Sequence, residues 1–331
     1  MPSAQKLDTH RKALTLNLDT STFGSFAEIG AGQEVARWFL VVGGASGTVA
    51  KAISAYDKEV SDDLYGSGSR YVSKQRLEAM LDNEWTQLLA QLSKTRGPHT
   101  RFFSFVDTVS ARNFAGTNDP HGWIGLRFQL QPGGPPNDVL LHINMLDPSN
   151  VLQQEAIGIL GVNLIYTAFY ELQTMESFLE GLAQDVVEER IEIDYVDLRG
   201  PAFESWDRRT LLAHLVYAGL ADAVFFPSKG PTAPPTEALY KKAVVLAPGT
   251  SGTWIQLTRK FTSDCWLRLF RSFGRRWAKQ SRRPLAFFAW QLLRPRRTNR
   301  LWRSPTCFVA SMRFSPLAAT YSFFANVSST I

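Results

Sequence analysis

The chain changes character near residue 250, and this break limits an ordinary folded core to the part before it. Residues 251–331 carry fifteen Lys and Arg against one acidic residue, Asp264, a net charge of +14. Residues 1–250 carry 21 basic and 29 acidic residues, a net charge of −8. The overall charge of +6 therefore averages an acidic body with a basic tail, and does not indicate an anionic partner for the whole protein.

These compositions divide the chain into three parts. We expect a flexible N-terminus over residues 1–20, a globular body over 21–250 and a poorly structured basic tail over 251–331. Both cysteines and five of the nine tryptophans lie in the tail, which is also rich in Arg, Phe, Ser and Pro. Its periodicity is poor, and it lacks the mixture of acidic and basic side chains found on folded surfaces. Such a composition is typical of a GC-rich gene read out of frame, so we interpret the chain as frameshifted or C-terminally truncated.

Two other interpretations of the tail remain open. It could be a nucleic-acid-binding arm, in which Arg neutralises phosphates while Trp and Phe stack on bases. It could also contain a membrane-surface helix, because five apolar residues follow a helical stripe: Trp266, Leu269, Phe270, Phe273 and Trp277. No run is long and apolar enough to predict a transmembrane segment.

The body has the sequence of a cytoplasmic protein. It contains no cysteine, which excludes disulfides and thiolate metal sites there. The first residues lack the apolar run of a secretory signal, so we expect a cytoplasmic location. The stretch Pro227–Pro235 is rich in Pro and Gly and predicts a linker.

Periodicity predicts a mixed α/β fold of the α+β-like kind, in which helices pack on a mixed sheet. Ser73 is expected to cap the clearest early helix. PGGPP, between two of the strands, predicts an antiparallel hairpin. Residues 16–26 form a poor strand. Helices are predicted over 33–40, 73–92, 150–170, 175–186 and 208–219, and strands over 101–109, 122–130, 138–146, 190–198, 223–226 and 243–246.

The first candidate site is the segment Glu28-Ile-Gly30-Ala-Gly32. A carboxylate just before Gly-x-Gly is similar to the loop that holds the ribose of a nucleotide or of S-adenosylmethionine. That chemistry needs a preceding strand and a third glycine, and neither is evident here. The alternative is a turn that only leads into a helix.

The second candidate is the glycine-rich run from Val41 to Lys51. Its backbone N–H groups could form a nest around a phosphate, although the spacing is not that of a Walker A loop. The alternative is tight packing, since glycine lets another backbone approach closely. The predicted ligand-binding residues here are Gly43, Gly44, Ser46, Gly47, Thr48 and Lys51.

The third candidate is the polar segment from Arg112 to His121, between two predicted strands. Arg112 could pair with a phosphate or carboxylate, and Asn118 could contact a ligand. His121 is the best general acid–base candidate because a loop leaves it accessible. We therefore predict Arg112 and His121 as catalytic residues. The alternative is a turn that Asn118 and its neighbours stabilise.

Other polar residues favour structural roles. His142, on an apolar strand, is predicted to be a buried, hydrogen-bonded core residue. His214 has no suitable partner one helical turn away, so a metal pair is not expected there. Asp62 and Asp63 could hold Mg²⁺, but acidic runs of this kind are usually solvated surface. We expect no metal site.

Several runs of the body stand out together: FGSFAEIGAGQEVARWF, GGASGTVAKAISAYD, GTNDPHGWIGLRFQ and NVLQQEAIGILGVNLIYTAFY. Through these runs the chain resembles a family of bacterial proteins that are substantially longer, and the resemblance extends from about Leu16 to Pro248. Its members carry inconsistent automatic labels, including nicotinate-nucleotide adenylyltransferase and TonB-dependent receptor. This chain lacks the H-x-G-H motif of such adenylyltransferases, and the signal peptide and many strands of such receptors. The resemblance implies no catalytic residues.

Taken together, these features predict a cytoplasmic protein that binds or transforms a phosphorylated or nucleotide-like metabolite. Its glycine-rich turns would bind phosphate, with Arg112 and His121 facing them. The sequence leaves open whether the protein is an enzyme, which cofactor it uses and how many copies associate. The alternatives are a non-catalytic scaffold or interaction protein, or a non-functional truncated product; nucleic acid is a partner only if the tail is native.

Overall fold

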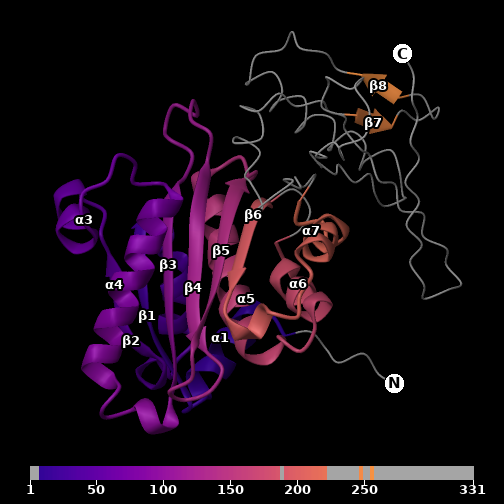
Figure 1. Cartoon of the computed structure of the whole chain (residues 1–331). Coiled ribbons are helices and arrows are strands. Elements are labelled where there is room, and N and C mark those ends of the chain that lie inside the picture. The colour runs from indigo at the N-terminus through magenta and orange to yellow at the C-terminus, as the bar shows by residue number, and fades with distance from the viewer. Residues whose placement is uncertain (1–6, 187–189, 222–245, 249–253, 257–331) are drawn as a thin grey trace, which may run out of the picture. The chain divides into compact units, whose positions relative to one another are not determined.

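The computed structural model describes residues 7–186, 190–221, 246–248 and 254–256 (Figure 1). The chain divides into two compact units, Met1–Asp207 and Arg208–Ile331. Within the second unit, the structure describes helix α7 (Arg208–Tyr217) and an antiparallel pair of short strands, β7 (Leu246–Pro248) and β8 (Trp254–Gln256).

The first unit is built on a six-stranded mixed sheet, which confirms the predicted α/β class (Figure 1). Its strand order is β2-β1-β3-β4-β5-β6. Strands β2, β1 and β3 are parallel, whereas β3 to β6 are antiparallel neighbours. The strands are β1 (Thr22–Gly30), β2 (Val49–Ser54), β3 (Arg101–Ser110), β4 (His121–Gln129), β5 (Pro136–Met145) and β6 (Ile191–Arg199).

Helices cover both faces of this sheet. Helix α4 places Leu77 and Met80 against Ala27 and Val106 on one face. On the other face, Phe26 contacts Phe39 of α2, α5 packs against α2, and α6 packs against α5. The helices of this unit are α1 (Thr9–Leu18), α2 (Glu34–Val41), α3 (Lys58–Tyr65), α4 (Lys74–Leu92), α5 (Asn150–Tyr170) and α6 (Met175–Ala183), with short 3-10 turns at Ala45–Gly47, Gly97–His99 and Pro201–Phe203.

Most elements predicted from periodicity are confirmed. The Ser73 hydroxyl caps α4 by accepting from the Arg76 N–H at 3.2 Å, and β4 and β5 form the predicted hairpin. Helix α7 ends shortly before Gly219, whose φ of 74° suits a glycine cap. The predicted strand at 223–226, the Pro227–Pro235 linker and the tail beyond residue 256 lie outside the described residues; of the predicted strand at 243–246 the structure describes only Leu246, the first residue of β7.

The expectation of a flexible N-terminus over residues 1–20 is wrong for α1. Asp8 caps this helix by accepting from the Arg11 N–H at 2.8 Å. Lys12 is 1% exposed and donates to Asn163 Oδ1 of α5 at 2.8 Å. Periodicity did not predict this helix, because polar residues such as Lys12 and Asn17 occupy buried positions. The helix therefore lacks the apolar stripe that normally marks an amphipathic helix.

The prediction of a poor strand over residues 16–26 also needs correction. Residues from Thr22 form β1, which lies between β2 and β3, and eight of its nine residues are buried. Helices cover both faces of this strand, so its residues do not alternate in polarity as those of a half-exposed strand do. Strand β2 and helix α3 were not predicted either.

Candidate functional site

The sheet has a topological switch point at the carboxyl ends of β1 and β3. From β1 the chain passes through α2 to β2, on one side of β1. It then returns through α3 and α4 to β3, on the other side of β1. The two connections therefore cover opposite faces of the sheet, and α/β proteins usually bind ligands at such a switch point.

Two buried carboxyl groups lie side by side just below this switch point. Glu28 of β1 pairs with Asp107 of β3 in the parallel register, so both side chains project from the same face. Glu28 is 4% exposed and Asp107 is fully buried. Neither oxygen of Asp107 has a hydrogen-bond partner among the described residues. An unpartnered buried group of this kind is rare in native proteins and requires an explanation.

The environment keeps both groups protonated to higher pH than usual. Burial raises the pKa of Glu28 to about 7. Burial, and then the nearby charge of Glu28, raise the pKa of Asp107 well above its ordinary value. Glu28 therefore exchanges its proton close to neutrality. Paired carboxyl groups whose pKa values are raised in this way are typical of acid–base and ligand-binding sites.

The Gly30–Gly32 turn lies directly against β3 and the Asp107 carboxyl group. A Cβ on Gly32 would lie 2.0 Å from both carboxyl oxygens of Asp107. Gly30 has a φ of 96°, and a Cβ there would lie 1.9 Å from the carbonyl oxygen of Val109. A side chain on Gly30 would therefore displace the β3 backbone, and one on Gly32 would displace the Asp107 carboxyl group. A strand does precede this turn and α2 follows at Glu34, so the judgement that the motif lacks its strand is corrected.

The second glycine-rich segment lies at the opposite end of the sheet. It precedes β2, whose first residue Val49 pairs with Gly24 near the start of β1. The segment wraps around Asn17 of α1, whose side-chain amide donates to the carbonyl oxygens of Phe39 and Gly43, each at 2.7 Å. The two glycine-rich turns therefore do not form one phosphate-binding nest.

Several residues of this second segment contact protein groups. A Cβ on Gly47 would lie 2.9 Å from the Asn17 carbonyl oxygen, and one on Gly44 would lie 3.3 Å from the Asn17 Cβ. Thr48 is buried and donates to the Leu16 carbonyl at 3.0 Å. Lys51 lies 2.7 Å from Glu84 of α4. Gly43 and Ser46 are exposed.

The loop between β3 and β4 lies at the same end of the sheet as Glu28 and Asp107, because it follows directly from Ser110 at the end of β3. Arg112 is exposed, and its backbone N–H donates to Gln153 of α5 at 2.8 Å. Asn118 accepts from the Asn113 N–H and donates to the Ala111 carbonyl, each at 2.8 Å. Asn118 therefore stabilises the loop, as the structural alternative predicted.

The structure also brings His121 next to a residue that was predicted to be structural. The rings of His121 and His142 are 5.6 Å apart, and Trp123 lies 4.8 Å from His142. His142 Nδ1 lies 2.6 Å from a carboxylate oxygen of Asp194 on β6. His142 is therefore a largely buried, hydrogen-bonded residue, as predicted. Trp123 packs with the α4 core cluster, so this histidine pair lies on the face of the sheet opposite Glu28 and Asp107.

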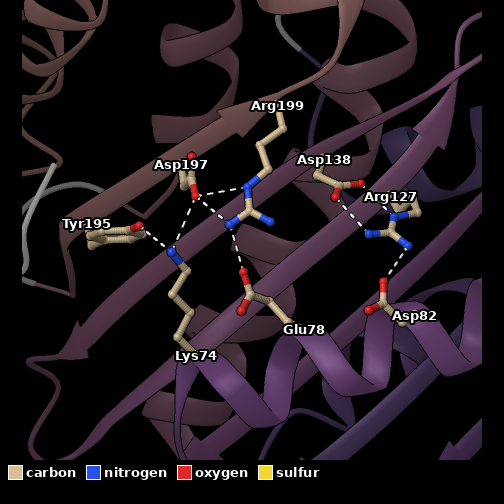
Figure 2. A network of polar contacts seen from close by, with 8 residues as sticks. All are labelled: Lys74, Glu78, Asp82, Arg127, Asp138, Tyr195, Asp197 and Arg199. Carbon is tan, nitrogen blue, oxygen red and sulfur yellow. Dashed lines mark hydrogen bonds and ion pairs between the residues drawn. The ribbon is translucent and has the colours of Figure 1, made fainter. Parts of the chain in front are cut away.

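Ion pairs join α4 to the antiparallel half of the sheet (Figure 2). Arg127 of β4 makes two hydrogen bonds to Asp138 and a third to Asp82 of α4, all between 2.7 and 2.8 Å. Arg199 of β6 bridges Asp197 and Glu78. Lys74 donates to the Tyr195 hydroxyl at 2.6 Å. These charges stabilise one another, so we assign them a structural role.

The other weaker candidates also have protein partners. Asp62 accepts hydrogen bonds from Arg76 and Tyr71 at 2.7 and 2.8 Å. His214, in the second unit, makes a ring contact with Tyr217. Within the described parts of the chain, no group of three or more His, Cys, Asp or Glu side chains is arranged to hold a metal ion. None of the described helices is both long enough and apolar enough to cross a membrane.

Comparisons with known proteins find partial likeness to solved structures. No protein-family model and no curated protein matches the chain. The competence/damage inducible protein CihA from Agrobacterium tumefaciens is 19% identical, with a TM-score of 0.35 over 49% of this chain and 96% of its own. A competence-damaged protein (CinA) superfamily member from Enterobacter cloacae is 12% identical, with a TM-score of 0.34 over 51% of this chain and 96% of its own. At these TM-scores, the likeness carries no argument about site or function.

Proposed function

We propose that this protein binds a nucleotide-like metabolite at the carboxyl ends of β1 and β3, with Glu28 as the principal polar contact. The observation that carries the proposal is the buried pair of Glu28 and Asp107 beneath the Gly30–Gly32 turn. Leaving a buried polar group without a partner costs about 1–3 kcal/mol. A ligand that donates a hydrogen bond to this pair would recover part of that cost.

The polar groups at the carboxyl ends of β1 and β3 favour a ligand that carries hydroxyl or amino groups at one end and a phosphate at the other. Carboxyl groups accept hydrogen bonds from ribose hydroxyls or from the amino groups of a base. The backbone N–H groups at the start of α2 suit a phosphate instead. Arg112, exposed at the same end of the sheet, could pair with that phosphate. In this arrangement Gly30, Gly32, Arg112 and Glu28 contact the ligand, and the Gly43–Gly47 segment does not.

Glu28 could also transfer a proton to or from the ligand. A general acid–base catalyst is most effective when its pKa lies near the working pH, and the pKa of Glu28 is about 7. Asp107 would act as a positioning residue, because it is fully buried beside Glu28.

The test is a binding screen on the full-length chain. Nucleosides, nucleoside mono- and diphosphates, dinucleotides and inorganic phosphate are added separately, and the shift in thermal unfolding is measured. A true ligand at 100 times its Kd should stabilise the protein by about 2.7 kcal/mol. The effect should disappear in Glu28→Gln and persist in the control Glu180→Gln, which alters an exposed carboxylate of α6. The absence of stabilisation by every compound would refute the proposal.

A second candidate is a non-catalytic scaffold, which two observations favour. The Gly43–Gly47 segment packs around Asn17, and the His121 ring bonds within its own loop, to the Asp119 carbonyl at 2.9 Å. For a scaffold, Glu28→Gln should change stability without changing the response to any small molecule. The same screen therefore separates the two functions.

A further inference from the structure

We infer that His121 and His142 form a binding site for one divalent transition-metal ion, such as Zn²⁺, Ni²⁺ or Cu²⁺. Each ring would supply its Nε2 atom as a ligand, and Asp194 would act as a positioning residue. This site lies on the α4 face of the sheet, so it is independent of the proposed ligand site around Glu28.

The pairing of β4 and β5 sets the distance between the rings. His121 pairs with Asn144, and Trp123 pairs with His142, so the two histidines are diagonal neighbours on one face of the hairpin. Their ring centres are 5.6 Å apart, with an angle of 46° between the planes. With metal–nitrogen bonds of about 2.0–2.1 Å, two imidazoles on one tetrahedral ion have ring centres roughly 5 Å apart. The observed separation of 5.6 Å is close to this value.

The hydrogen bonds of both rings select the tautomer that a metal requires. His142 Nδ1 faces the Asp194 carboxylate at 2.6 Å, and His121 Nδ1 faces the Asp119 carbonyl at 2.9 Å. A carbonyl oxygen or an ionised carboxylate can only accept, so each Nδ1 must carry the proton and donate it. The lone pair of each ring is then on Nε2. Metal-binding histidines almost always have their second nitrogen fixed in this way.

Neighbouring side chains fix the orientation of the His142 ring. Asn144 donates to the second Asp194 oxygen at 2.9 Å, which orients the carboxylate toward His142. Trp123 lies beside His142, with 4.8 Å between the ring centres, and limits the rotation of that ring. Two protein nitrogens leave the other coordination positions to water or a substrate, as in an open metal site rather than a closed structural one.

The experiment uses the full-length chain with Cys265 and Cys307 replaced by Ser, so that thiolates cannot contribute. Zn²⁺ binding is measured by titration calorimetry, and Co²⁺ is titrated while its visible absorption is recorded. We expect one ion per chain. Binding should be lost in His121→Gln and in His142→Gln, weakened about 10–100-fold in Asp194→Asn, and unchanged in His99→Gln, which alters an exposed histidine elsewhere.

Two results would overturn the inference. One is the absence of saturable binding by the parent protein, and the other is undiminished binding by both His121→Gln and His142→Gln. Circular dichroism checks that each variant is folded. If His142→Gln does not fold, His121→Gln decides the question, because His121 lies at the start of β4 and its ring nitrogen bonds to the nearby Asp119 carbonyl.

Discussion

Replacing Glu28 with Gln should stabilise the protein above neutral pH and have little effect in mild acid. The pKa of Glu28 is raised from 4.5 to about 7 in the folded protein. A carboxyl group whose folded pKa is raised contributes stability that is fully present below its unfolded pKa and is lost as the pH rises through its folded pKa. For Glu28 the loss therefore occurs between about pH 4.5 and pH 7.

The size of the effect follows from the same shift. The rise in pKa from 4.5 to about 7 corresponds to about 3.5 kcal/mol, since each pKa unit represents roughly 1.4 kcal/mol. Glutamine has nearly the same shape and does not titrate. The free energy of unfolding of Glu28→Gln should therefore exceed that of the wild type by up to about 3.5 kcal/mol near pH 8 and differ little from it near pH 4.5. The pKa of Asp107 is also raised, so Asp107 contributes to the pH dependence of stability in both proteins.

Urea unfolding of the full-length chain at several pH values measures this difference. The free energy of unfolding is determined for the wild type, Glu28→Gln and the control Glu180→Gln. The free energy of unfolding of the wild type and of the control should fall together as the pH rises. That of Glu28→Gln should depend less on pH. Parallel curves for all three proteins would show that Glu28 does not titrate in a buried site, and a less stable Glu28→Gln protein near pH 8 would refute the reasoning outright.

Three further predictions concern the packing of the fold and can be checked by urea unfolding. Lys12→Ala should destabilise the protein by about 1–3 kcal/mol because Asn163 Oδ1 loses its buried donor; a negligible change would mean that α1 is not docked as described. Gly32→Ala should cost at least about 1–3 kcal/mol through the clash with Asp107, and more than Gly43→Ala, whose Cβ would meet nothing within 4 Å; the reverse order would contradict the turn geometry. Arg127→Met should cost about 3–5 kcal/mol if Asp138 behaves as a buried charge that loses its partner, and the double variant Arg127→Met/Asp138→Leu should recover part of this loss.

The sequence predicted elements best where local signals agreed. Helix α4 has an apolar stripe and a Ser73 cap, and α5 is a long apolar run, so both were predicted within a residue of their observed bounds. Strand β1 gave no such signal because both of its faces are buried and Glu28 lies among its apolar residues. The prediction missed helix α1 for a related reason. Buried Lys12 is stabilised by a hydrogen bond to the distant Asn163, which no local sequence pattern contains.

The sequence came closer to predicting the His121–His142 pair than the Glu28–Asp107 pair. A hairpin centred between Pro132 and Gly133 places His121 opposite Asn144, two residues from His142. The predicted strands 122–130 and 138–146, paired end to end, centre the hairpin on Gly134 instead and place His121 opposite Asp147. The sequence therefore put both histidines near one hairpin but did not bring them side by side. Glu28 and Asp107 lie on parallel strands joined through α2, β2, α3 and α4. No turn fixes their register, because packing of the helices against the sheet determines which residues pair. Only the three-dimensional structure could reveal that these two carboxyl groups share one buried site.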